Sequence, residues 1–423
     1  MSATVTVDTT TQFQTMTGWE AVAQGGQASP GFPGWQASLM DLAANDLGLN
    51  RIRLEVRSGA ENPVDYYLQM RSGVISDTEW RARRYAPVND NADAASVNAN
   101  GYHWGELDEA IDRVVLPMRQ RLVARGEQLY VNLTYVAFDG PTIHTENAAE
   151  YAEFMLAAFQ HMQSAYGFVP NSIEVILEPD NIAPWTGTHI GSVIAATGQR
   201  LAAAGYTPEF IAPSVTNMAN TVPYFDAIWS VAGARTYLKE IAYHRYSGVS
   251  DANLAAIRSR AAQFGLRTAQ LEHIGSGVED LYKDLTIANA SAWQQFALGF
   301  PGVGDNGAQY YTIDGNQPVA GSQTKEFKQY FQYVRFGARR VAAASSSSGV
   351  RPVAFTNPGG GAVVVVHLVG RETLLIKGLR PGRYLITATP ASVAATGEAQ
   401  ADANGELRLT ATGGCLLTVS RAP

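Results

Sequence analysis

The sequence predicts an eight-stranded α/β barrel joined to a small β-sandwich, and three observations lead to that fold class. Strand-like and helix-like segments alternate eight times, a run of alanine and serine interrupts the pattern, and only short strand-like segments follow it. A chain of 423 residues also exceeds the usual size of one hydrophobic core, which favours a large domain with a smaller one.

Strands that alternate with helices pair in parallel through right-handed crossovers. The β-rich segments are 16–24, 51–56, 128–136, 173–179, 209–215, 240–246, 267–273 and 308–314. Helical periodicity lies at 104–126, 146–166, 188–204, 251–264, 279–299 and 324–343. Eight units indicate a closed barrel. The main alternative, a doubly wound sheet, would carry a glycine-rich phosphate loop after its first strand, and the sequence shows none.

The second domain begins after a linker of small residues, Ala342–Gly349. Beyond it, short β-rich segments alternate with turn signals such as Asn-Pro-Gly-Gly-Gly and Asp-Ala-Asn-Gly, which is typical of an antiparallel β-sandwich. The isolated strand Thr4–Asp8 precedes the barrel, and we expect it to complete the sandwich. The predicted organisation is therefore a sandwich strand in 1–12, a catalytic barrel in 13–343 and a sandwich in 350–423.

One predicted barrel loop is much longer than the usual two to six residues. It spans 57–103, between the second strand and its helix, and carries Tyr66, Tyr67, Arg71, Trp80, Arg81 and Tyr102. On the catalytic face of a barrel this loop either shapes a substrate pocket, which we favour, or packs as a lid or a dimer contact.

Composition excludes several classes of protein. Charged residues make up 16% of the chain and hydrophobic residues 46%, as in a well-packed globular enzyme. The net charge of −7 offers no basic surface for nucleic acid. The single cysteine, Cys415, rules out an internal disulfide framework. No segment is long and apolar enough to span a membrane, and the first residues lack a signal peptide. We expect a secreted or periplasmic protein whose signal peptide has been removed rather than a cytoplasmic one; the oligomeric state stays open.

Two glutamates end apolar strands in positions that suit catalysis. Glu178 closes the fourth predicted strand and Glu272 closes the seventh. Active sites of such barrels lie at the carboxyl ends of the strands, and strands four and seven face each other across the mouth. Two carboxyl groups that flank a sugar are what glycosidic cleavage needs. Either glutamate alone is better explained as a solvated residue at a strand end, but the two together favour a glycosidase.

Several motifs resemble a known family. Catalytic glutamates after strands four and seven are the arrangement of glycoside hydrolase clan A, and the chain resembles family 30, which joins its barrel to a β-sandwich built from both termini. Phe327–Val341 resembles that family's last barrel helix and its exit, and Val353–Gly359 resembles the start of its side domain. His244-Arg-Tyr246 and Arg53 are similar to the clan's sixth-strand and second-strand motifs.

The resemblance implies a retaining mechanism, with Glu272 as the nucleophile and Glu178 as the general acid/base. The two carboxyl groups would then lie about 5–5.5 Å apart, and Glu178 would start protonated while Glu272 is ionised. Tyr246 and Arg53 are the expected donors to Glu272, and His244 is expected to position a hydroxyl or the acid/base, with a satisfied core histidine as its alternative.

The sequence also departs from the family. Leu177 stands where clan members carry an asparagine that binds the sugar 2-hydroxyl, so we expect Asn181 or Asn132 to replace it, or a different reading of that hydroxyl. Glu20 adds a carboxylate near the mouth and Glu55 is a possible fourth, which favours neutral sugars over uronic acids.

Three aromatic residues lie at predicted strand ends or in the loops after them: Trp19, Trp185 and Tyr310. Stacking platforms for sugar rings and packing at the barrel rim explain them equally well. No histidine pair has metal-ligand spacing and no EF-hand loop is present, so we expect neither a metal nor a cofactor.

The leading hypothesis is a retaining glycoside hydrolase that cleaves a β-glycosidic bond, with exo-action favoured by the long loop. The alternatives are an endo-acting polysaccharide hydrolase and a carbohydrate-binding protein that keeps the scaffold without catalysis. A barrel enzyme of unrelated chemistry also stays open, since fold alone does not fix function.

Overall fold

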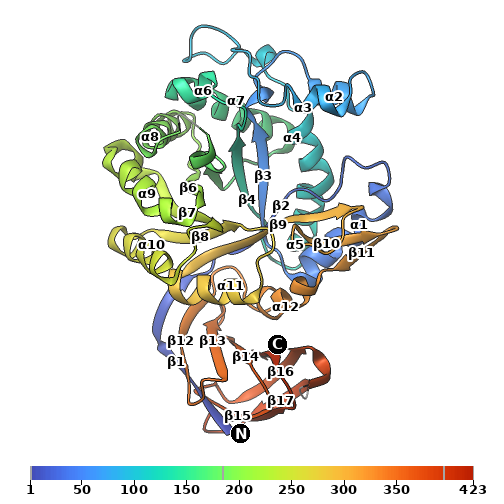
Figure 1. Cartoon of the computed structure of the whole chain (residues 1–423), viewed down its shortest axis with the longest axis vertical. Coiled ribbons are helices and arrows are strands. Elements are labelled where there is room, and N and C mark those ends of the chain that lie inside the picture. Colours follow the sequence, from blue (N-terminus) through green and yellow to red (C-terminus); the bar gives the residue numbers. More distant parts are fainter. Residues whose placement is uncertain (1, 183–184, 394–395, 423) are drawn as a thin grey trace.

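The computed structural model describes residues 2–182, 185–393 and 396–422. Met1 and Pro423, the outer ends of the two predicted sandwich segments, lie outside the described residues. Figure 1 shows the barrel above and the sandwich below it, with both chain termini in the sandwich.

Eight parallel strands form a closed barrel, as the sequence predicts. Each strand pairs with the next, and the last one pairs with both the seventh and the first, which closes the ring. The strands are β2 (Gly18–Val22), β3 (Arg51–Arg57), β4 (Tyr130–Val136), β5 (Ser172–Glu174), β6 (Glu209–Asn217), β7 (Leu238–Ser247), β8 (Arg267–Glu272) and β9 (Ala290–Pro301).

Helices surround this barrel (Figure 1). They are α1 (Gln36–Asp41), α4 (Gly105–Ala110), α5 (Leu116–Ala124), α7 (Ala148–Tyr166), α8 (Gly187–Ala203), α9 (Thr221–Ser230), α10 (Asp251–Phe264), α11 (Val278–Lys283) and α12 (Ser322–Phe331). Helix α7 shows how the sequence sets such a helix. The side chain of Asn147 caps its first turn, Gly167 ends it in a left-handed conformation, and the predicted apolar face from Tyr151 to Met162 is buried.

The eighth strand was predicted in the wrong place. The segment 279–299 was expected to be a helix, but the helical part ends at Ala288 and β9 follows. The segment 308–314, expected to close the barrel, is β10 (Gln309–Asp314), which pairs in parallel with the outer part of β9 and carries the antiparallel strand β11 (Gln317–Ala320). The reason is burial: β9 is covered along nearly its whole length, so its sequence lacks the alternation of a half-exposed strand.

A nine-stranded sheet forms the sandwich, in the order β17-β16-β19-β14-β13-β12-β1-β15-β18. Its strands are β1 (Ser2–Thr15), β12 (Arg339–Ser345), β13 (Val350–Thr356), β14 (Ala362–Leu368), β15 (Glu372–Lys377), β16 (Gly382–Thr389), β17 (Gly397–Ala401), β18 (Leu407–Ala411) and β19 (Cys415–Arg421). The N-terminal strand joins the sheet as expected, antiparallel to β12 and parallel to β15. A separate apolar core, which includes Val5, Val364, Leu374 and Leu417, fills the space inside it.

The connection between the two domains differs from the prediction. The last barrel helix ends at Phe331, and the end of the predicted helix 324–343 together with the start of the predicted linker forms β12 of the sandwich. Residues 339–345 therefore lie in the sandwich sheet, although 13–343 was expected to be barrel. Small residues suit this strand because it pairs on both sides, with β1 and with β13.

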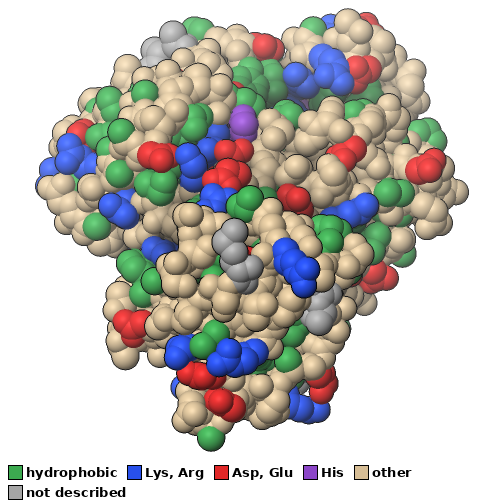
Figure 2. Space-filling model, turned by 60° about the horizontal axis from the view of Figure 1, so that its bottom comes forward, with side chains coloured by type: hydrophobic (Ala, Val, Ile, Leu, Met, Phe, Trp, Pro, Cys, Tyr) green, Lys and Arg blue, Asp and Glu red, His purple; other side chains and the backbone are tan. Residues whose placement is uncertain are grey.

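The long loop after β3 is built around short helices rather than being irregular. These are η3 (Ser58–Ala60), α2 (Tyr66–Arg71), α3 (Asp77–Arg81) and η4 (Ala99–Gly101), which lie over one side of the barrel mouth (Figure 1). On the face drawn in Figure 2, acidic and basic side chains are interspersed rather than gathered into a broad basic surface. Within the described ranges, none of the helices has the length and apolar character needed to cross a membrane.

Candidate active site

Glu178 and Glu272 come from opposite sides of the barrel. Glu178 follows β5, the fourth barrel strand, and Glu272 is the last residue of β8, the seventh. One carboxylate oxygen of each, together with a ring nitrogen of His244 on β7, lies within 4.8 Å of the others. This spacing agrees with the roughly 5–5.5 Å of a retaining pair and is well below the 6.5–9.5 Å of an inverting pair.

Glu272 is held by the two donors that the sequence suggested. The guanidinium of Arg53 lies 2.6 Å from Glu272 Oε2, and the hydroxyl of Tyr246 donates to Oε1 at 2.8 Å. Arg53 is buried on β3 and also donates to the carbonyl of Leu271 and to Glu55. These contacts fix the orientation of the carboxylate toward the barrel mouth.

Glu178 is held by a histidine and an asparagine. Its Oε1 lies 3.0 Å from Nδ1 of the buried His244, and Asn181 donates to its Oε2 at 3.1 Å. Burial raises the pKa of Glu178, but the hydrogen bond from His244 and the positive charges of His244 and Arg53 outweigh it, so the pKa lies below its usual value. Burial likewise lowers the pKa of His244, but its bond to Glu178 and the charge of Glu272 raise it overall.

This result differs from the expectation that Glu178 starts protonated. Here the hydrogen bond between His244 Nδ1 and Glu178 Oε1 favours the ionised carboxylate and the protonated imidazole, because it lowers the pKa of Glu178 and raises that of His244. The two groups are close enough to titrate as one unit that shares a proton.

The backbone also places Glu178 in a special conformation. Its φ and ψ are 54° and 56°, in the left-handed region that only a few non-glycine residues adopt. The amide of Glu178 donates to the carbonyl of Ser214, and the amide of Leu177 donates to that of Tyr135, so the chain is held between the two neighbouring strands. Such conformations are found at functional sites, where the surrounding structure imposes them.

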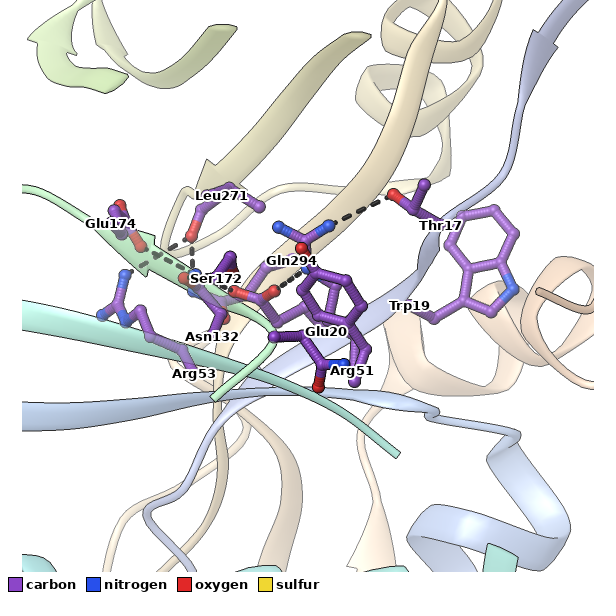
Figure 3. Close-up of polar contacts among 12 residues, drawn as sticks. Thr17, Trp19, Glu20, Arg51, Arg53, Asn132, Ser172, Glu174, Leu271 and Gln294 are labelled. Carbon is purple, nitrogen blue, oxygen red and sulfur yellow. Dashed lines mark hydrogen bonds and ion pairs between the residues drawn. The ribbon is translucent and has the colours of Figure 1, made fainter. Parts of the chain in front are cut away.

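Glu20 and Asn132 do not reach the mouth. Both are fully buried inside the barrel, where Glu20 pairs with Arg51 and Asn132 donates to Glu174 at 3.0 Å (Figure 3). The prediction that they contact substrate is wrong, because both side chains are 0% exposed and are held by partners inside the barrel. Burial and the charge of Glu174 raise the pKa of Glu20 to about 6, although Arg51 opposes this.

Three predicted stacking platforms are also inside the protein. Trp19, Trp185 and Tyr310 are each at most 1% exposed. Trp19 stacks on Phe331 and donates to the carbonyl of Val334, and the hydroxyl of Tyr310 donates to the carbonyl of Glu20. These rings pack the barrel and its rim, which leaves no face for a sugar.

Leu177 belongs to a small apolar group. It is buried against Val136, at the end of β4, and Tyr85, which comes from the long loop. This side of the acid/base is therefore an apolar wall, whereas Asn181 is exposed and contacts Glu178. Of the two asparagines that the sequence suggested as replacements, only Asn181 lies at the glutamate pair.

A series of ion pairs connects the glutamate pair with the long loop. The sequence had suggested only its first two members, Arg53 and Glu55. Arg53 contacts Glu55, Glu55 contacts Arg57, and Arg57 contacts Glu106. Glu55 and Arg57 line a hollow of about 540 Å³ that opens between the loop, the end of β2 and β9. Its further lining residues include Gln24, Tyr67, Arg71, Trp80, Arg81 and Phe300. Glu178 and Glu272 do not line this hollow themselves, so it lies beside the glutamate pair, next to Glu55.

Glu178, His244 and Glu272 also form a group whose spacing would allow a metal ion. Arg53 already places a positive charge on Glu272, and His244 directs Nδ1 toward Glu178 rather than toward a shared centre. This donor set suits proton transfer better than a cation.

The sequence matches no family model and no curated protein. The fold, however, matches solved structures of glycoside hydrolases, among them members of family 30. The catalytic domain of xylanase C of family 30 from Talaromyces cellulolyticus superposes with a TM-score of 0.72 at 17% identity, covering 99% of this chain and 100% of that one. An endoxylanase of family 30 from Clostridium papyrosolvens gives 0.69 at 15% identity, with both chains fully covered. A β-xylosidase from Caulobacter crescentus gives 0.56 at 11% identity, covering 99% and 100%. The barrel with its sandwich thus follows the family 30 architecture throughout.

Proposed function

We propose that this protein is a retaining glycoside hydrolase that cleaves a β-glycosidic bond, with Glu272 as the nucleophile and Glu178 as the general acid/base. The observation that carries the proposal is the spacing of the two carboxylates, within 4.8 Å across the barrel mouth. The family 30 architecture supports it, because enzymes with this fold include xylanases and a β-xylosidase.

In the first step Glu272 attacks the anomeric carbon while the leaving oxygen takes a proton from Glu178. Arg53 and Tyr246 hold the attacking carboxylate in place through contacts at 2.6 and 2.8 Å. In the second step Glu178 removes a proton from water, and the water displaces Glu272 from the sugar.

The proton for the first step comes from the pair that Glu178 forms with His244. The imidazolium Nδ1 points at Glu178 Oε1, and transfer along this bond makes Glu178 the acid when the leaving oxygen is in position. His244 then acts as a positioning residue and proton store rather than as the base. A neighbouring group of this kind keeps the acid active at higher pH.

The long loop favours exo-action on chain ends or small glycosides, because it encloses one side of the barrel mouth. Its residues line the hollow next to Glu55. The neighbours by fold include an endoxylanase and a β-xylosidase, so an endo-acting polysaccharide hydrolase is the second candidate. A carbohydrate-binding protein without catalysis is the third, and the apolar wall at Leu177 is the feature that favours it. We further propose that the protein is exported, as one matching structure is described.

The test is release of 4-nitrophenol from a panel of α- and β-glycosides. We expect wild type to act on a β-glycoside and Glu272→Ala to lose activity by about 10⁴-fold. Adding azide to Glu272→Ala should restore turnover and give the α-glycosyl azide, because azide attacks from the face that Glu272 occupied. Azide with Glu178→Ala should give the β-glycosyl azide.

Glu146→Gln, an exposed residue after the third barrel strand, is the matched control and should keep full activity. If each variant gave the azide of the opposite stereochemistry, Glu178 would be the nucleophile and Glu272 the general acid/base. If wild type releases nothing from small glycosides but shortens a β-glycan, the endo-acting candidate replaces the exo-acting one. Binding of glycans without cleavage would establish the non-catalytic candidate.

A further inference from the structure

A buried aspartate behind the barrel wall connects the two strands that flank β8. Asp284 directly follows α11 and is 0% exposed. Its Oδ1 accepts hydrogen bonds from the hydroxyl of Tyr243 at 2.9 Å and from the guanidinium of Arg245 at 2.7 Å, both on β7. Its Oδ2 accepts a hydrogen bond at 2.9 Å from the indole nitrogen of Trp293 on β9. Because β8 lies between β7 and β9, one carboxylate holds both neighbours of the strand that ends in Glu272.

The same stretch of β7 carries the donors to the glutamate pair on its other face. Successive side chains of a strand point to opposite faces, so Tyr243 and Arg245 point away from the barrel interior toward Asp284. The residues next to them, His244 and Tyr246, point inward and contact the two glutamates at the mouth. Side chains held by Asp284 and side chains that hold the glutamates therefore alternate along four consecutive residues.

The backbone pairing of β7 is irregular at this stretch. Toward β8, the register shifts between Tyr243 and His244. Toward β6, it shifts between the pairs that Tyr243 and Ser247 make. A shift in register interrupts the regular ladder and re-aims the side chains beside it. Contacts between side chains are therefore needed to fix where His244 and Tyr246 point, and those of Asp284 lie directly behind them.

The bonds of Asp284 leave its carboxylate a single arrangement. Burial raises its pKa to about 6, although the charge of Arg245 and the hydrogen bonds from Trp293 and Tyr243 oppose this rise. Arg245 is itself only 4% exposed, and its second partner is Asp280 on α11 at 2.7 Å. A buried ion pair is costly to break, and here two oxygens accept three hydrogen bonds from two strands.

We propose that Asp284 is a positioning residue for catalysis, which fixes β7 and β9 on either side of β8 so that His244 and Tyr246 reach the glutamate pair. The inference rests on the proposed glycosidase function and adds to it a residue that lies outside the reacting groups. A displacement of about 1 Å at a catalytic group can cost about 100-fold in rate, so loosening this contact should lower kcat.

Asp284→Asn tests this role, with Glu240→Ala as the matched control. Asparagine keeps an acceptor for β7 but turns amide donors toward the indole N–H of Trp293, so the bond to β9 is lost. Glu240→Ala also breaks a buried ion pair on β7, but near the start of that strand. On the β-glycoside that wild type cleaves, we expect kcat per folded molecule to fall about tenfold or more in Asp284→Asn, with KM changed by less than about twofold. The control should stay near wild type, and Tyr243→Phe replaces Asp284→Asn if the latter fails to fold.

A second measurement does not depend on turnover. The protein has seven histidines, so NMR of isotope-labelled histidine side chains can follow His244, whose signal is identified by its loss in His244→Gln. Burial lowers its pKa, but the bond to Glu178 and the nearby charges of Glu272 and Glu174 raise it overall. We expect Asp284→Asn to weaken the bond to Glu178 and to lower the titration midpoint of His244, whereas the control leaves it unchanged.

Two results would overturn the proposal. A wild-type histidine titration together with a wild-type kcat in Asp284→Asn would show that this aspartate only stabilises the fold. Equal losses of kcat per folded molecule in Asp284→Asn and Glu240→Ala would show a general effect of disturbing β7. If wild type cleaves no glycoside, the proposed function fails, while the titration of His244 still decides whether Asp284 positions it.

Discussion

The barrel contains two groups of carboxylates that differ mainly in depth. At the mouth, Glu178 and Glu272 approach each other, and each is held by donors that leave part of the carboxylate open. Inside, Glu20 and Glu240 are completely buried and share Arg51, which lies 2.7 Å from Glu240 (Figure 3 shows Glu20 and Arg51). Glutamates of one barrel thus form the proposed catalytic pair at the mouth and part of a buried ion-pair network inside.

This difference shows that the partners of a carboxylate in the barrel decide its role. Glu20 pairs with Arg51 of the adjacent strand, and Glu240 pairs with Arg51 across the barrel and with Arg267 of the adjacent strand. Both interior acids are 0% exposed, so no ligand reaches them. The mouth acids face each other, and like charges at this distance are useful only when one of them exchanges a proton.

The largest effect that tests this contrast is expected in the interior. Glu240→Ala removes one partner of Arg51 and leaves a buried guanidinium poorly compensated, which should lower the free energy of unfolding by about 3–5 kcal/mol. Chemical denaturation measures it, with the exposed Glu79→Gln as control. Activity per folded molecule should stay near wild type; a loss comparable to that of Glu272→Ala would show that the interior network takes part in catalysis.

The pH profile tests the proton shared at the mouth. The pKa of His244 is raised and that of Glu178 is lowered, so the pair keeps its proton until the pH rises through the raised pKa of His244. In His244→Gln the acid depends on Glu178 alone, and the basic limb of kcat/KM should move to lower pH. The profile is measured against that of Glu146→Gln. An unchanged basic limb with a uniformly lower rate would assign His244 a structural role only.

Asn181 offers a smaller change at the same carboxylate. Asn181→Ala removes the donor to Glu178 Oε2, a charge-assisted hydrogen bond, and should lower kcat about tenfold while Tm hardly changes. Steady-state kinetics and a melting curve check both halves of this expectation. If KM rises and kcat does not fall, Asn181 contacts the substrate rather than the acid.

The smallest effect on activity is expected at Trp19, which the sequence suggested as a platform for the sugar. Trp19→Phe loses the hydrogen bond to the carbonyl of Val334 and part of the stacking on Phe331, which should cost roughly 1–3 kcal/mol of stability. Its kcat/KM should equal that of wild type. A raised KM with unchanged stability would bring Trp19 back as a substrate contact.

The sequence predicted the parts of the fold whose patterns are local. The parallel barrel, the sandwich with its N-terminal strand and the position of Glu272 at a strand end follow from alternation and from where each strand stops. The predicted strand 173–179 is shorter than expected: β5 ends at Glu174, so Glu178 stands four residues beyond it. The sequence prediction was wrong at β9, because a strand buried on both faces has the same apolar content as a buried helix.

Depth inside the barrel was the other quantity that the sequence did not reveal. Glu20 and Asn132 lie on barrel strands like the mouth residues, and only their burial and their partners, Arg51 and Glu174, show that they lie inside the barrel. The predictions for Trp185 and Tyr310 were wrong for a related reason. An aromatic ring that packs the core and one that binds a sugar look the same in the sequence.

The left-handed backbone at Glu178 has a consequence for how such a protein tolerates change. A glutamate at φ 54° is held there by its neighbours at the expense of folding free energy, whereas glycine adopts that conformation freely. Glu178→Gly would thus give up the acid and gain about 1 kcal/mol in stability. The proposed acid thus stands at a position whose backbone conformation favours glycine, so the glutamate there costs folding free energy.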